Sequence, residues 1–243
     1  MQQISRYAGL VAGALFLRTQ AYEDMREARS PVLTGLVIIV VVGVIVALIT
    51  LVGTALEWAS TPNLAAIQEV VYEGITQMPW YEETLQMVPG YDETFRQYYD
   101  LGWTLGRTFG AGSPGSALGN VVLTPLGLIV AWLVYGLLAH VVARLLKGEG
   151  NLAQTLGCTA LAVAPQVLKL AELAPYVTVG GVVGTWTLIC RYLALKQAHG
   201  FSWGRAFWAT ALPLVILWLV GLILVALGVL VFATLASALL GGV

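Results

Sequence analysis

Charged residues are scarce in this sequence. The 243 residues include 12 lysines and arginines and 13 aspartates and glutamates, which is 10% of the chain, whereas about a quarter of a soluble domain is charged. So few charges cannot cover a water-exposed surface, so a soluble globular protein is excluded. The formal net charge is −1, and no cluster of basic residues that would bind phosphates is present, which argues against a nucleic-acid partner.

Metal ligands and catalytic motifs are also lacking. The two histidines, His140 and His199, lie in different segments and have no cysteine or carboxylate at ligand spacing, so we expect no metal site. His140 lies four residues before Arg144, where both side chains can reach the membrane interface or pair locally. Nucleophile elbows, phosphate-binding loops and dinucleotide fingerprints are absent from the sequence. We therefore predict no catalytic residues, no cofactor and no enzymatic activity.

Cysteine is rare as well. Cys158 and Cys190 both lie inside apolar runs, so we expect them to be buried as small apolar side chains.

Long apolar runs, in contrast, are abundant. Apolar residues make up 58% of the chain and the mean hydropathy is +0.83. A helix needs about 20 apolar residues to cross a hydrocarbon core of about 30 Å. This pattern predicts an all-α membrane protein with five transmembrane helices, of which the third is short. The predicted spans are residues 32–56, 118–143, 152–168, 176–195 and 207–240.

The spans divide the chain into four parts. Residues 1–31 form a cytoplasmic N-terminal segment, residues 32–56 the first transmembrane helix, residues 57–117 an external loop, and residues 118–243 a four-helix transmembrane region.

The N-terminal segment has the pattern of an amphipathic helix. Ile4, Tyr7, Val11 and Leu15 recur on one helical face, which predicts a helix lying along the cytoplasmic interface. A helix that packs against the bundle explains the same spacing equally well.

The positions of lysine and arginine predict the orientation, because cytoplasmic loops carry the excess of these residues. One side of a five-span protein receives nine of them: Arg6, Arg18, Arg26, Arg29, Arg144, Lys147, Arg191, Lys196 and Arg205. The opposite side receives only Arg96, Arg107 and Lys169. We therefore expect a multi-pass protein of the cell membrane, with the N-terminus in the cytoplasm and both the C-terminus and the 57–117 loop outside.

The 57–117 loop is acidic and rich in aromatic residues. It holds eight of the chain's acidic residues and two of its basic ones. We expect helices over residues 64–78 and 91–109, separated by Pro79 and Pro89. One interpretation is a lid or docking surface, with Trp80, Tyr81 and Trp103 as candidate partner contacts. The other is that acidic residues simply accumulate outside because they contribute little to topology. No calcium-loop spacing is present.

Glycines and prolines within the spans suggest further contacts. Gly180 and Gly184 have the small-xxx-small spacing that lets helices approach closely, so they are candidates for helix packing or partner contact. Prolines kink the spans. Pro125, Trp132 and Pro165 could therefore line a cavity, although kinked helices can also simply pack.

The order of segments resembles a known family. The stretches "HVVARLLKGEGNLAQTLGCTALAVAPQVL" and "VGTWTLICRYLALKQAHGFSWGRAFWATALPLVI" are similar to the bacterial branch of the YIP family, membrane proteins first named for interacting with Ypt and Rab GTPases. The resemblance covers roughly residues 10–235 and leaves the 57–117 loop without a familiar pattern. Cys158 stands where many members have an aromatic residue. The resemblance implies five spans with a cytoplasmic N-terminus and no catalytic residues.

These features lead to a functional hypothesis. We expect a non-enzymatic protein of the bacterial inner membrane that acts as a scaffold or as an accessory subunit of a larger complex, in contact with the lipid bilayer and with other membrane proteins in a homo- or hetero-oligomer. The alternative is a transporter or lipid-handling protein with a cavity between proline-kinked helices.

Overall fold

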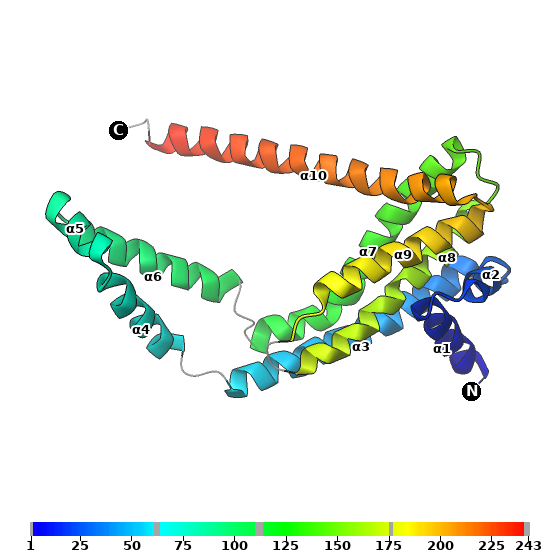
Figure 1. Cartoon of the computed structure of the whole chain (residues 1–243), viewed down its shortest axis with the longest axis horizontal. Helices are drawn as coiled ribbons and strands as arrows, with labels where there is room; N and C mark the ends of the chain where they lie inside the picture. Colours follow the sequence, from blue (N-terminus) through cyan, green and yellow to red (C-terminus); the bar gives the residue numbers. More distant parts are fainter. Residues whose placement is uncertain (1, 61–63, 110–113, 175–176, 241–243) are drawn as a thin grey trace.

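The structure is a computed structural model, which describes residues 2–60, 64–109, 114–174 and 177–240. Within these ranges all regular secondary structure is helical, and no strand occurs. The helices that form the bundle are α3 (Pro31–Ser60), α7 (Pro114–Leu145), α8 (Leu152–Ala160) with its 3-10 continuation η1 (Leu161–Leu173), α9 (Gly180–His199) and α10 (Trp203–Leu240). Helix α3 packs against α7, α8 and η1, and α9 packs against α8 and η1. Figure 1 shows most of α10 extending away from these helices.

Within the described ranges, four segments are long and apolar enough to cross a membrane: Pro31–Leu56, Gly119–Leu145, Leu152–Leu173 and Trp203–Val231. They confirm a multi-pass membrane protein and match four of the predicted spans. The predicted span at residues 176–195 corresponds to α9, although Tyr176 itself lies outside the described residues. Helix α9 does not meet the same criterion, because glycines and the charged Arg191 and Lys196 dilute its apolar character. The fifth span therefore stays a prediction.

Local sequence signals explain where the short third segment begins and changes form. Asn151 caps α8 through a capping box: its Oδ1 accepts from the Gln154 backbone N–H at 2.9 Å, and the Gln154 side chain accepts from Asn151 N at 3.1 Å. Pro165 lies in the following 3-10 helix. The proline ring clashes with the carbonyl of the residue four positions earlier, which here is Leu161, the residue where the α-helix changes to the 3-10 helix.

Close approach between helices depends on glycines that the sequence analysis did not single out for this role. A Cβ atom added at Gly35 would lie 2.6 Å from Ala160 Cβ, and one added at Gly157 would lie 2.5 Å from Pro31 Cβ. A Cβ at Gly43 would lie 2.8 Å from Pro125 Cα. The contacts of α3 with α8 and with α7 therefore require residues without a side chain.

The N-terminal segment forms α1 (Gln2–Leu15) and α2 (Thr19–Arg26), which pack against the bundle. Leu10 and Ala14 are buried, and the Trp186 indole N–H of α9 donates to Leu15 O at 2.7 Å. This arrangement agrees with the second interpretation of the amphipathic pattern. Contact with the membrane interface stays a prediction, and the side chain of Ile4 lies outside the described residues.

The acidic loop contains three helices, α4 (Leu64–Thr76), α5 (Pro79–Met87) and α6 (Tyr91–Phe109). The sequence analysis predicted two of them and missed α5. We had treated Pro79 as a helix breaker, whereas it occupies the first turn of α5, where proline is tolerated because that N–H has no helical partner. We call α4, α5 and α6 the acidic module, and Figure 1 shows it at the end of the molecule opposite α1 and α2.

Candidate functional site

The structure brings together two histidines that the sequence analysis had assigned to separate segments. His140 on α7 and His199 at the end of α9 have ring centroids 5.6 Å apart. Thr155 on α8 lies between them, with its Oγ1 2.9 Å from His140 Nδ1 and 2.9 Å from His199 Nε2. Thr155 and His199 are both buried. One hydroxyl therefore joins the ends of three helices.

The hydrogen bonds define the proton positions in this cluster. The Gly150 backbone N–H donates to His199 Nδ1 at 3.1 Å, so Nδ1 carries no proton and the Nε2–H of the neutral ring donates to Thr155 Oγ1. Thr155 Oγ1 in turn donates to Asn151 O at 3.0 Å. Its second lone pair accepts from His140 Nδ1. His140 Nδ1, Thr155 Oγ1 and both ring nitrogens of His199 thus each have a hydrogen-bond partner. A buried polar network is stable when its members are paired in this way.

Two glycines allow the turn between α7 and α8 to approach His199. A Cβ at Gly148 would lie 2.5 Å from His199 Nδ1 and 2.7 Å from Phe201 Cζ. A Cβ at Gly150 would overlap Ala198 O. Among the described residues no group of three His, Cys, Asp or Glu side chains could hold a metal ion. The hydrogen bonds of Thr155 with His140 and His199 connect α7, α8 and α9.

A small cavity lies between α3, α7, η1 and α9. Its volume is about 60 Å³, and since about 10–15 Å³ is enough for one water, it has room for a few waters. Trp132 lines it and donates its indole N–H to Leu156 O at 2.9 Å. Pro125 and Pro165 do not line it; Pro165 is fully buried and Pro125 packs against Gly43. The helices thus pack at these two prolines, and an acyl chain does not fit in the cavity.

Arg191 is the functional candidate that the sequence analysis missed. We had counted it only as a topology signal, whereas its guanidinium lies 4.1 Å from the centroid of the Tyr135 ring and lines the same cavity. Tyr135 Oη and Thr187 Oγ1 are buried and have no hydrogen-bond partner in the described part of the chain. An arginine within an otherwise apolar run is the signal that could have identified this site.

Gly180 and Gly184 lie on an exposed part of α9. A Cβ atom added at either would meet nothing within 4 Å. They therefore make no close helix contact within the described structure, and their role in partner contact stays a prediction. The predicted burial of the cysteines is confirmed, since Cys158 and Cys190 are both free and 0% exposed.

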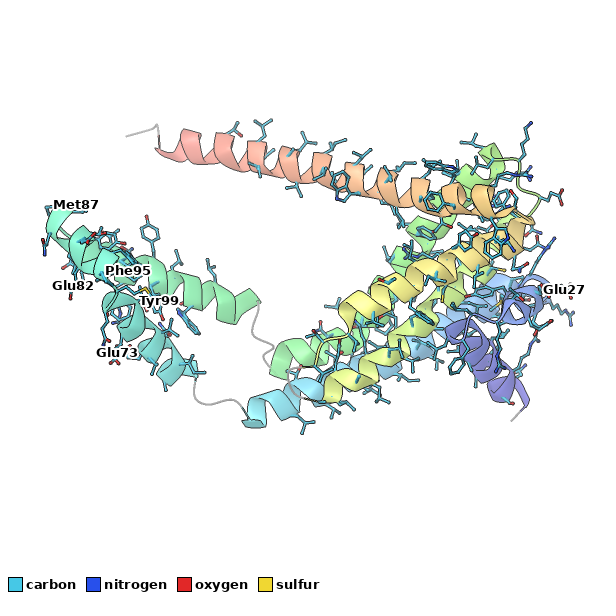
Figure 2. All side chains as sticks on the ribbon, in the orientation of Figure 1. Glu27, Glu73, Glu82, Met87, Phe95 and Tyr99 are labelled. Carbon is cyan, nitrogen blue, oxygen red and sulfur yellow. The ribbon has the colours of Figure 1, made fainter. Side chains whose placement is uncertain are left out.

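The acidic module is held together by aromatic rings and by Asp92. Phe95 lies within 5.2 Å of the Tyr81 ring centroid, and Tyr81 and Tyr72 donate to Asp92 Oδ1 at 2.7 and 3.1 Å. Burial of Tyr81 and its bond to Asp92 raise the pKa of the phenol above its ordinary value. Figure 2 shows Phe95 inside the module.

The three candidate contacts in the module differ in exposure. Tyr81 is only 2% exposed and belongs to the core of the module, so it is not available to a partner in this conformation. Trp80 is 44% exposed. Trp103 is partly covered and packs against Tyr99, with ring centroids 6.2 Å apart. Trp80 is thus the candidate that the structure leaves most accessible.

Comparison with known proteins agrees with the helical membrane architecture. The family model for the Yip1 domain matches residues 12–225, which includes α2 to α9 and most of α10. No curated protein and no solved structure matches the chain. Because the family model covers most of the chain, the protein belongs to the Yip1 family.

Proposed function

We propose that this protein is a non-enzymatic scaffold or accessory subunit of a membrane complex, and that the acidic module binds a partner membrane protein with a basic outer surface. One observation carries the proposal: the helices of the module contact one another, and the module still exposes acidic and apolar side chains. Apolar surface with a polar rim is typical of a protein interaction site.

The contacts inside the module account for its fold. Besides the Phe95 cluster, the Gln68 side chain donates to Asp100 Oδ1 at 2.7 Å, and Tyr99 Oη donates to Gln68 O at 2.6 Å. Arg96 bridges Glu69 at 3.2 Å and Asp100 at 3.6 Å. These bonds join α4 to α6 through contacts within the chain itself.

The exposed acids favour a cationic partner. Four carboxylates, Glu73, Glu82, Glu83 and Glu93, are exposed and form no ion pair within the described residues. Met87, which is 72% exposed, lies near Glu82 at the tip of the module (Figure 2). Complementary charge steers partners together and selects among them. A basic surface beside apolar side chains would match this combination.

The arrangement in the membrane completes the proposal. With five spans and a cytoplasmic N-terminus, the acidic module faces outward and the histidine cluster, the α7–α8 turn and α1 face the cytoplasm. The excess of lysine and arginine in those regions supports this orientation.

The test is the native mass of the protein after gentle extraction from its own membrane. We expect the wild-type chain to carry a partner subunit in fixed ratio, and we expect the combined changes Glu82→Gln, Glu83→Gln and Glu93→Gln to release it. The matched control is Glu27→Gln with Glu149→Gln, which neutralises exposed acids outside the module.

Salt provides a second comparison, because exposed charge contacts are screened at high ionic strength. The partner should dissociate from the wild-type chain as salt rises. The proposal is wrong if the module variant and the control retain the same partner equally, or if the wild-type particle carries none.

A further inference from the structure

Arg191 carries a positive charge into the helical bundle and has no anionic partner among the described residues. No described carboxylate pairs with it, and its guanidinium donates no hydrogen bond to the described residues. The Tyr135 ring is its one described contact of electrostatic character, at 4.1 Å. A charge inside a membrane protein is costly unless a counter-charge or water compensates it. The chain therefore leaves a position for an anion.

The cavity beside Arg191 supplies the space. It is about 60 Å³ in volume and is lined by no acidic residue, so nothing in its wall repels an anion. A space that holds a few waters suits a phosphate group and is too small for an acyl chain. Ala131 lines the cavity and is exposed on the surface of α7, so the cavity opens toward the outside of the bundle at that residue.

The polar groups around the cavity suit phosphate. A guanidinium can bind phosphate through two parallel N–H donors. The Gln166 amide also lines the cavity and makes no hydrogen bond with the described residues. Tyr135 and Thr187 contribute two further hydroxyl groups that have no partner in the described part of the chain. Such a set offers several neutral donors around one fixed positive charge.

We propose that the cavity at Arg191 binds a phosphate group, carried by the headgroup of an anionic phospholipid or present as inorganic phosphate. The position of the opening favours the lipid, because Ala131 lies on a face of α7 that the membrane would cover. Only the headgroup phosphate would enter, and the acyl chains would stay in the bilayer. This site is independent of the acidic module and of the partner proposed for it.

The experiment measures thermal unfolding of the full chain in a neutral detergent, with three probes added separately: phosphatidylglycerol, phosphatidylcholine and inorganic phosphate. We expect phosphatidylglycerol to raise the unfolding temperature in a saturable way. Arg191→Gln should weaken the apparent affinity by about 10- to 100-fold, since hydrogen bonds to charged groups are lost. Arg205→Gln, at an exposed arginine outside the cavity, is the matched control and should bind as the wild type does.

Two further variants keep the test decisive. Arg191→Lys retains the charge without the paired donors, so it should bind more weakly than the wild type and more tightly than Arg191→Gln. Ala131→Leu retains Arg191 and narrows the opening of the cavity, so it should also weaken binding. If Arg191→Gln does not fold, the affinity of Ala131→Leu tests the proposal in its place.

Each outcome has one meaning. Selective stabilisation by phosphatidylglycerol supports the site with a lipid as its source. Stabilisation by inorganic phosphate that depends on Arg191 also supports the site and assigns the free anion as its source. Effects of lipid or phosphate that persist in both Arg191→Gln and Ala131→Leu overturn the proposal, as does the absence of stabilisation by all three probes.

Discussion

Replacing Gly150 with alanine tests the packing of the α7–α8 turn against α9. A Cβ atom at this position would overlap Ala198 O and lie 3.1 Å from His199 Nδ1. Ala198 O is a backbone atom, so it cannot rotate away from the new Cβ as the end of a long side chain could. We therefore expect the turn to move away from α9.

The expected cost has two parts. Overpacking a tight contact costs about 1–3 kcal/mol, and losing the hydrogen bond from Gly150 N to His199 Nδ1 costs about 1 kcal/mol. Gly150→Ala should therefore reduce the free energy of unfolding by about 2–4 kcal/mol. Gly127→Ala is the matched control, because a Cβ there meets nothing within 4 Å and alanine gains up to about 1 kcal/mol in a helix interior.

The assay is equilibrium unfolding of both variants and the wild type in the same mixed micelles, followed by tryptophan fluorescence. The clash argument fails if Gly150→Ala is as stable as Gly127→Ala. A stability loss in both variants would also refute it, because the loss would then not depend on the contact with Ala198.

Three other predictions concern the polar cluster, the acidic module and the orientation. Thr155→Val should destabilise the fold by about 2–3 kcal/mol in the same unfolding assay, because it leaves buried donors without their shared acceptor. Tyr81 should stabilise the module below about pH 10, and the stability of the module should fall above that pH, because the unfolded phenol then loses its proton while the raised pKa keeps the folded phenol protonated. Circular dichroism of the wild type and Tyr81→Phe at increasing pH measures this effect. An equal loss of stability at alkaline pH in both proteins would contradict the prediction. Glu83→Cys should react with an impermeant maleimide added outside intact cells, whereas Glu149→Cys should react only after permeabilisation. The two native cysteines are buried, so we expect them not to react. The reverse pattern would show the opposite orientation.

Local signals in the sequence predicted the elements well. The apolar runs indicate the long helices. The structure shows two further local signals, Pro31 as the first residue of α3 and the capping box of Asn151 with Gln154 at the start of α8. The helix α5 was missed for a local reason as well. A proline such as Pro79 can end one helix or begin the next, and the residues after it determine which of the two occurs.

Contacts between distant segments could not be predicted in this way. His140 and His199 lie close together because the ends of α7, α8 and α9 converge. The spacing of these residues along the chain does not indicate this convergence. Glycines show the same limit. Gly180 and Gly184 have a helix-packing spacing but are exposed, whereas Gly43 lies against Pro125. Close approach depends on which helix lies opposite, and the spacing alone does not identify that helix.

The native mass of the gently extracted wild-type particle tests the central claim most directly. The chain has a mass of 25.9 kDa. A protein that works by association should appear in a larger particle of fixed composition, and neutralising the exposed carboxylates of the acidic module should reduce that particle's mass by the mass of the partner. A wild-type particle that contains one copy of this chain and no other protein would contradict the account.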